Sequence, residues 1–173
     1  MREIFLKNKH IIIFPLSHNV LVDTLNFTIN NKQLLDNNNL FLVEYNKHNY
    51  LKDKNKIKKN SVYYLLKKLE KLNIEYSFLD VGAQKQHNLF INNSSWRELL
   101  ALYLFSFYKW RNRLLIKNKF PSFYKYILKD REEIMMKKIK EKLVNSSKNL
   151  VIIVGKIHYD ELFNRMRLLK HVF

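Results

Sequence analysis

Four short apolar runs, separated by segments with helical spacing, constrain the fold of this chain more than any other feature. The runs cover residues 10–14, 40–45, 74–81 and 150–155. The runs at 10–14 and 40–45 have the composition of buried strands, and those at 74–81 and 150–155 are expected to form the third and fourth strands. Between them, apolar residues recur at helical spacing in segments 61–72, 94–110 and 121–144.

Strands that alternate with helices predict a parallel sheet covered by helices, joined by right-handed crossovers. We therefore expect a single α/β domain over residues 1–173. It should contain about four mostly parallel strands, flanking helices and a long helical pair before the last strand.

Polar side chains lie at the end of each of the four runs or shortly after it. His18 comes after the first, Glu44 and Asp80 close the second and third, and His158 follows the fourth. Ligands of open parallel sheets bind outside the carboxyl ends of the strands, so these side chains are expected to converge. Two histidines and a carboxylate suffice for a divalent metal site or for acid–base chemistry. Because strand ends commonly carry polar residues, a purely structural role stays open.

The ordered set of motifs resembles the TraB family, which is related to the Tiki proteases and more distantly to erythromycin-esterase and ChaN-like proteins. Family members carry two G-x-x-H motifs at strand ends, an acid after the second strand, Asp after the third, and an E-R-N/D-x-x-M-A helix. The matching segments here are 15–18, 41–46, 78–80, 129–136 and 151–158. They follow the family order across nearly the whole chain.

The resemblance implies a site lined by His18, Glu44, Arg131 and His158, with His18, Glu44 and His158 as ligands of a divalent metal in a hydrolase. Two departures suggest that such a site is partly eroded. Pro15 replaces the first glycine, and Tyr45-Asn46 replaces the usual Leu-Asp pair. Arg131 also has a simpler interpretation, as part of the polar first turn of a helix.

The chain is strongly basic, with 32 Lys and Arg against 15 Asp and Glu and a formal net charge of +17. A field of this kind favours a polyanionic partner, through release of counterions from phosphate. The 25 Lys against 7 Arg, together with 21 Asn, are also typical of an AT-rich genome. That bias raises the Lys content but does not explain why acids are scarce.

Two basic segments are candidates for RNA binding. One is a Lys/Asn-rich segment, and the other interleaves cations with aromatic side chains that suit unpaired bases. The candidate residues are Lys54, Lys56, Lys58, Lys59, Lys109, Trp110, Arg111, Arg113, Lys117 and Lys119. The alternative for the second segment is an amphipathic core helix with a basic outer face.

Cysteine is absent, which excludes disulfides and thiolate-ligated metals. No apolar run approaches the roughly 20 residues of a membrane span, and residues 1–10 resemble neither a signal nor a transit peptide. Together with an amino-acid composition typical of an AT-rich genome, these features predict an organelle-encoded protein of the mitochondrial matrix. The alternative is a cytoplasmic protein of a bacterium with an AT-rich genome.

The predicted function is a non-catalytic, RNA-associated structural component of a mitochondrial ribosome, built on a TraB-like fold without a cofactor. Its partners would be ribosomal RNA and neighbouring proteins. One alternative is a metal-dependent hydrolase of the TraB/Tiki type. Another is an accessory subunit of a mitochondrial membrane complex, packed through the aromatic segment 96–110.

Overall fold

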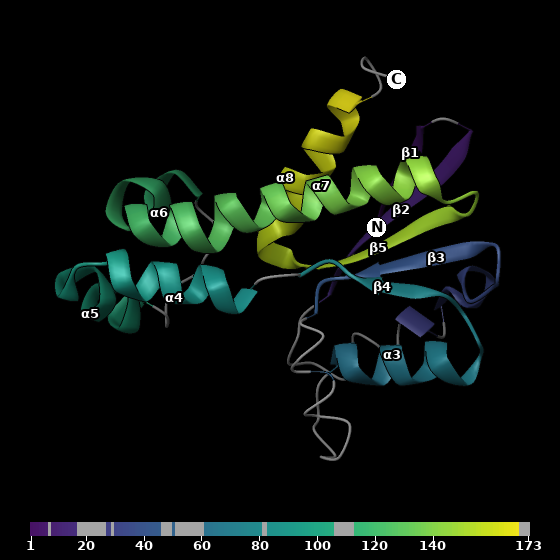
Figure 1. Ribbon diagram of the computed structural model, residues 1–173, viewed down its shortest axis with the longest axis horizontal. Coiled ribbons are helices and arrows are strands. Elements are labelled where there is room, and N and C mark those ends of the chain that lie inside the picture. Colours follow the sequence, from purple (N-terminus) through teal and green to yellow (C-terminus); the bar gives the residue numbers. More distant parts are fainter. Residues whose placement is uncertain are drawn as a thin grey trace.

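The computed structural model describes residues 1–6, 8–16, 27–28, 30–45, 50, 61–80, 83–105 and 113–169. Five strands form one sheet in the order β1-β2-β5-β3-β4 (Figure 1). They are β1 (Arg2–Leu6), β2 (Lys9–Leu16), β3 (Asn39–Val43), β4 (Tyr76–Phe78) and β5 (Asn149–Gly155). All neighbouring pairs are parallel except β1 with β2. The predicted α/β class and mostly parallel sheet are confirmed.

The strand number was underestimated by one, because β1 was not expected. In this strand only Ile4 and Leu6 are buried, and the residues between and before them are exposed. Only one face of this edge strand is covered, and its apolar run, Ile4–Leu6, is three residues long, too short to predict a buried strand. Of the four predicted strands, β2, β3 and β5 are buried on both faces.

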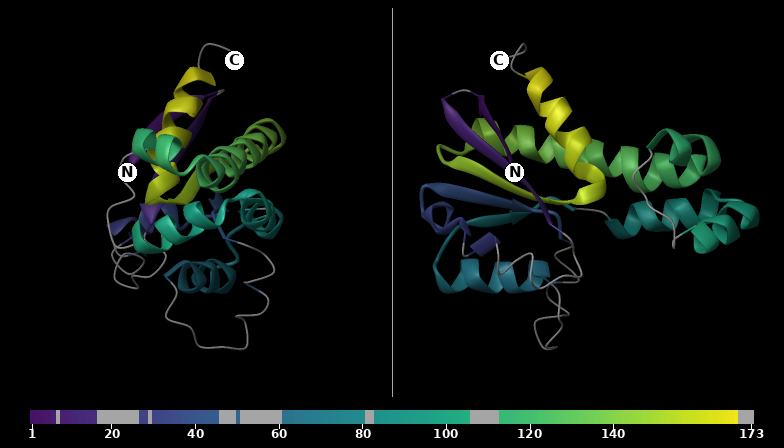
Figure 2. Two further views of the ribbon diagram at one scale, coloured as in Figure 1. Left: turned by 90° about the vertical axis from the view of Figure 1, so that its left-hand side faces the viewer. Right: turned by 180° about the vertical axis from the view of Figure 1, so that it is seen from behind.

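Helices cover both faces of the sheet. On one face lie α7 (Asp130–Asn145) and α8 (Lys156–Leu168), and on the other lies α3 (Ser61–Lys71) (Figures 1 and 2). In β2, Ile11 and Ile13 pack toward α7 and α8, whereas Ile12 and Phe14 pack toward α3. The alternation of Cβ directions along a strand places consecutive side chains in these two separate cores.

The α3 core includes a polar cluster that ties the helix to the sheet. Glu70 accepts hydrogen bonds from the hydroxyls of Tyr50 (2.5 Å) and Tyr76 (2.9 Å) and from Lys67 Nζ (3.0 Å). Burial raises the pKa of Glu70, but these three donors outweigh it and lower the pKa from 4.5 to about 2. Burial, followed by the bond to Glu70, raises the pKa of Tyr50 well above its usual value.

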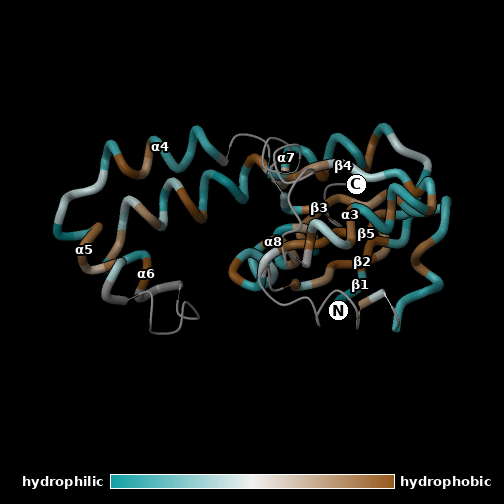
Figure 3. Tube along the Cα trace, turned by 90° about the horizontal axis from the view of Figure 1, so that it is seen from below, coloured by the Kyte–Doolittle hydropathy of each residue, from teal (hydrophilic) through white to brown (hydrophobic). Residues whose placement is uncertain are grey.

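A bundle of shorter helices extends beyond the carboxyl edge of the sheet (Figure 1). It consists of α4 (Ala83–Asn93), α5 (Trp96–Phe105), α6 (Arg113–Lys119) and the π-helix η2 (Phe123–Lys129). We call residues 83–105 and 113–129 the helical arm. It has its own apolar cluster, separate from both sheet cores, made of Phe90, Leu102, Ile116, Phe120 and Leu128. Hydrophobic stretches in the strands and the separate arm are visible together in Figure 3.

Several element boundaries differ from the sequence prediction. The third strand was expected over 74–81, but β4 covers only Tyr76–Phe78. Leu72, expected on the buried stripe of α3, is 44% exposed and follows the end of the helix. The last helix, α8, begins at Lys156 directly after β5, so His158 lies inside its first turn.

The expected long helical pair is present in part. The Ser95 hydroxyl accepts the Glu98 N–H at 3.1 Å and caps the start of α5, which runs to Phe105. Residues 106–112 lie outside the described residues, so the predicted continuation to residue 110 is not tested. The second helix starts at Pro121 and runs through η2 into α7. Within the described ranges, no helix combines the length and apolar character needed to cross a bilayer.

Candidate functional site

The carboxyl ends of β3, β4 and β5 carry a group of charged side chains. Glu44 lies directly after β3, Asp80 lies two residues after β4, and His158 is the third residue of α8, directly after β5. Arg131 and Glu132 join them from the first turn of α7. The parallel strands bring these ends to one edge, as the sequence predicted. We call these five residues the edge cluster.

Arg131 joins two carboxylates in the edge cluster. Its Nε donates to Asp80 Oδ1 at 3.2 Å and its Nη2 to Asp80 Oδ2 at 2.6 Å, a two-point contact that fits the planar guanidinium. The same Nη2 lies 3.1 Å from Glu44 Oε1. The other oxygen of Glu44 accepts the Gly155 N–H at 2.6 Å. Arg131 therefore holds the ends of β3 and β4 together against α7.

His158 occupies the innermost position of the edge cluster. Its Nδ1 lies 2.8 Å from Glu132 Oε1, and its Nε2 lies 3.5 Å from Glu44 Oε1. An ionised carboxylate only accepts hydrogen bonds, so with Glu132 ionised Nδ1 carries the hydrogen. His158 is 1% exposed, and Glu132 is fully buried. The imidazole thus connects α8 to α7 and to the end of β3.

Burial dominates the electrostatics of Asp80. Loss of water around its carboxylate raises the pKa of Asp80, while the charge and hydrogen bonds of Arg131 act in the opposite direction and lower it. The side chains of Asp80 and Arg131 keep 11% and 18% exposure, more than the rest of the edge cluster. Solvent therefore approaches the cluster from the Asp80–Arg131 side.

The edge cluster contains part of the predicted catalytic and metal site. Glu44, Arg131 and His158 are brought together, whereas His18 lies outside the described residues. In the part of the chain that is described, no group of three or more His, Asp or Glu is placed to hold a metal ion. Both oxygens of Glu44 are already engaged by Arg131 and Gly155. A histidine with a carboxylate behind it is nevertheless an arrangement that metal ligands and acid–base catalysts use.

Glu132 was not recognised from the sequence as part of the site. In the sequence it stands between Asp130 and Glu133, where it resembles any polar residue at the start of a helix. The signal that identifies it is its phase, because it falls on the buried face of α7. It precedes the buried residues Met135, Met136, Ile139 and Leu143 at helical spacing. A glutamate on an apolar face needs a partner, and His158 supplies it.

The predicted RNA-binding residues are described only in part. Lys54, Lys56, Lys58, Lys59, Lys109, Trp110 and Arg111 lie outside the described residues, and Arg113 is described by its backbone alone. Lys117 and Lys119 are exposed on α6. Other cations, not singled out from the sequence, are exposed on the same arm: Lys85, Arg97, Lys125 and Lys129.

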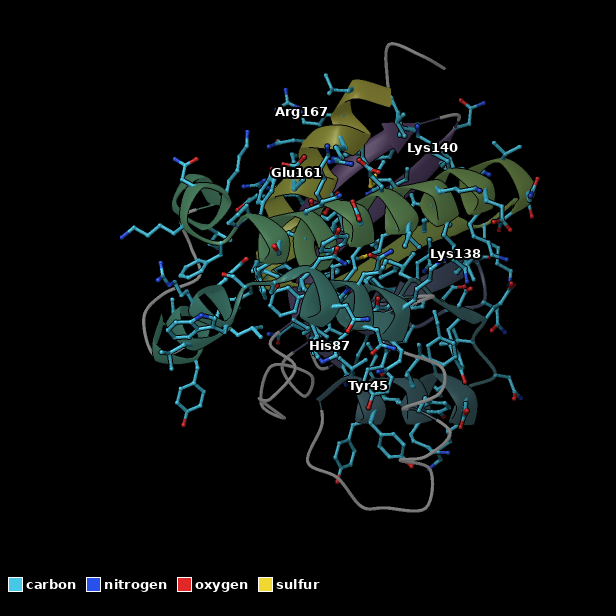
Figure 4. The ribbon with its side chains drawn as sticks, turned by 60° about the vertical axis from the view of Figure 1, so that its left-hand side comes forward. Tyr45, His87, Lys138, Lys140, Glu161 and Arg167 are labelled. Atoms are coloured by element: carbon cyan, nitrogen blue, oxygen red, sulfur yellow. The ribbon has the colours of Figure 1, made fainter. Side chains whose placement is uncertain are left out.

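The helical arm holds an unusual share of the charge. Residues 83–129 contain nine Lys and Arg and a single acid, Glu98, and therefore account for +8 of the chain's +17. Glu98 is only 9% exposed, and its Oε1 accepts the Phe123 N–H at 3.0 Å inside the arm. The sole carboxylate side chain of this segment thus faces inward. Outside the arm, α7 also exposes lysines, and Lys140 of that helix is labelled in Figure 4.

Comparison with protein-family models, with curated proteins and with solved structures finds no match for this chain.

Proposed function

We propose that this protein is a basic, non-catalytic structural component of a mitochondrial ribosome and that its helical arm binds ribosomal RNA. The observation that carries the proposal is the charge of the arm, where the described residues include six exposed cations and one acid, the buried Glu98. Exposed cations without neighbouring acids attract phosphate, and the release of counterions from the phosphate makes binding favourable. The high Lys and Asn content, typical of an AT-rich genome, supports an organelle-encoded origin.

The edge cluster supports a structural role for the residues that resemble a catalytic site. Arg131 forms ion pairs with the carboxylates of both Glu44 and Asp80, and Glu132 and His158 contact each other in the interior. The cluster links three strands to two helices at the position where the arm leaves the sheet. In this proposal the edge cluster stabilises the junction between the sheet and the RNA-binding arm, in a TraB-like fold that no longer has catalytic activity.

The proposal is tested by measuring RNA affinity of the full chain between about 50 and 200 mM salt, with a fluorescently labelled ribosomal RNA fragment. The test variant removes three exposed arm lysines: Lys117→Ala, Lys119→Ala and Lys125→Ala. The matched control removes three exposed lysines elsewhere, Lys68→Ala, Lys71→Ala and Lys140→Ala, so that both variants have the same net charge. We expect the wild-type protein to show a steep salt dependence.

Each lost phosphate contact lowers the slope of log affinity against log salt by about 1, so the arm variant should lose a slope of roughly 2 to 3. The control should lose much less. A flat salt response of the wild-type protein removes RNA from the proposal. Equal losses in the two variants would show instead that the charge acts without regard to its position on the molecule.

The alternative of a metal-dependent hydrolase is favoured by one observation, the Glu132–His158–Glu44 arrangement at the carboxyl edge of the sheet. If His18 approaches the same edge, His18, Glu44 and His158 would supply the ligands, and Glu132 would orient the imidazole of His158. Stoichiometric uptake of a divalent ion, measured by calorimetry on the isolated protein, would favour this alternative. A protein that takes up no such ion supports the non-catalytic proposal.

A further inference from the structure

The end of the helical arm exposes aromatic side chains. On α5, Trp96 is 69% exposed, Leu100 50% and Tyr103 70%. Their spacing of four and three residues places them on one face of the helix. On the opposite face, Glu98 and Leu102 are turned into the arm. The α5 helix lies at the part of the arm furthest from the sheet (Figures 1 and 3).

Cations accompany these rings. The guanidinium of Arg97 lies 5.6 Å from the centre of the Trp96 ring, and Lys125 Nζ lies 4.8 Å from the centre of the Tyr126 ring elsewhere on the arm. Exposed aromatic planes beside cations are the combination that binds single-stranded nucleic acid, since bases stack on the rings and phosphates contact the cations. Trp96 and Tyr103 are seven residues apart, about 10 Å along the helix axis.

The chemistry of this face favours unpaired RNA over a membrane surface. A helix that lies in a membrane interface buries a broad face of Leu, Phe and Trp side chains along its length. Over residues 96–103, α5 exposes only one aliphatic side chain larger than alanine, Leu100. A paired duplex is also disfavoured, because its bases are stacked within the helix and its surface offers phosphate and sugar instead.

We propose that the exposed face of α5 is a stacking platform for unpaired RNA bases, with the rings of Trp96 and Tyr103 as the stacking surfaces and Arg97 as the adjacent phosphate contact. The inference rests on the proposed RNA binding by the arm and adds the class of RNA, namely single-stranded segments. Lysines of α6 and η2 would contact RNA of any structure, whereas the α5 face would distinguish unpaired from paired RNA.

The test compares three labelled probes on the full chain: a 12-nucleotide oligouridine, a 12-base-pair RNA duplex, and vesicles of phosphatidylcholine with phosphatidylserine. The test variant is Trp96→Ala with Tyr103→Ala. The matched control is Val144→Ala with Leu168→Ala, because these side chains are 59% and 66% exposed and lie outside the arm. Trp96→Phe, which keeps a ring, is the conservative variant. Circular dichroism confirms that each variant is folded.

We expect the test variant to bind oligouridine about 10-fold or more weakly than the wild-type protein, since each stacked base contributes a factor of roughly 5 to 100. Duplex affinity should change less than about threefold, and Trp96→Phe should retain most of the oligouridine affinity. Equal losses for oligouridine and duplex, or no loss for either, would overturn the stacking platform. Loss of vesicle binding with unchanged RNA binding would overturn it in favour of a membrane contact.

The same experiment separates this inference from the function on which it rests. A wild-type protein that binds neither oligouridine nor duplex contradicts RNA binding as a whole. A wild-type protein that binds both probes equally and does not depend on Trp96 leaves RNA binding in place and overturns only the stacking platform.

Discussion

Replacing Arg131 with methionine is expected to destabilise the fold more than any other single loss of charge in the edge cluster. Methionine keeps an apolar stem of similar length but removes the guanidinium. The substitution leaves the Glu44 and Asp80 side chains, 5% and 11% exposed, without their cation. Removing one partner of a buried ion pair typically costs about 3 to 5 kcal/mol of unfolding free energy.

The structure places the expected loss at the lower end of that range, about 3 kcal/mol. Arg131 is itself 18% exposed, so water can partly replace it on the Asp80 side, and Glu44 keeps the Gly155 N–H. For a domain of this size, each kcal/mol lowers the melting temperature by about 2 to 4 °C, which gives a decrease of roughly 6 to 12 °C.

The assay is urea unfolding followed by circular dichroism, with Arg167→Met as the control. Arg167 is an exposed arginine on α8, so the same chemical change there should alter the unfolding free energy by no more than about 0.5 kcal/mol. The difference between the two variants isolates the buried ion pairs from the effect of changing an arginine.

The loss should also depend on pH. Burial already raises the pKa of Asp80, and removing Arg131 takes away the charge that opposes this, so the pKa of Asp80 rises further in the folded variant. A carboxyl whose folded pKa lies above its unfolded value stabilises the fold below the unfolded pKa and loses this contribution as pH rises through the folded pKa. The unfolding free energy of Arg131→Met should therefore fall further below that of the wild-type protein at pH 7 than at pH 5. A deficit no larger than that of the control, or one that grows toward low pH, would refute this account of the cluster.

Two further substitutions test the polar contacts of the interior. Glu132→Ala should lower the unfolding free energy by about 1 to 3 kcal/mol, because it leaves the buried His158 Nδ1–H without its acceptor, whereas Glu133→Ala at the adjacent exposed position should change it little. Equal effects in urea unfolding would show that the Glu132–His158 contact adds nothing. For Glu70, whose folded pKa is lowered to about 2 from 4.5, the stabilising contribution is present above pH 4.5 and is lost as pH falls toward 2. The wild-type protein should thus lose more stability between pH 5 and pH 2.5 than Glu70→Gln, and parallel pH profiles of the two proteins would contradict this.

The sequence predicted those elements whose buried residues form a simple pattern of apolar positions. Strands β2, β3 and β5 are covered on both faces, so they form continuous apolar runs. The buried stripe of α3 was likewise recognisable from its spacing. The edge strand β1 and the Asn/Gln-rich helix α4 were not predicted. The apolar run of β1 is only three residues long, and the apolar residues of α4 are few. The structure of these two elements depends on contacts with β2 and with the rest of the arm rather than on their own pattern.

The edge cluster was predicted to a similar extent. The rule that polar residues after parallel strands converge identified Glu44, Asp80 and His158, because strand direction follows from the alternation of elements. The partners of His158 could not be predicted by that rule, since Glu132 reaches the edge from a helix. The distribution of charge between sheet and arm also required the structure, because only the fold shows that the helical arm stands apart from the sheet.

The π-helix η2 has a consequence for how the arm and the sheet are aligned. A π-helical bond spans one more residue than an α-helical bond, and each residue of an α-helix turns the chain by about 100°. Side chains after Lys129 therefore point in directions different from those on an uninterrupted α-helix. Leu128 faces the core of the arm, while Arg131 and Glu132 face the carboxyl edge of the sheet. The π-helical segment thus rotates the side chains of α7 relative to those of the arm. As a result, one continuous helix contacts both the core of the arm and the carboxyl edge of the sheet.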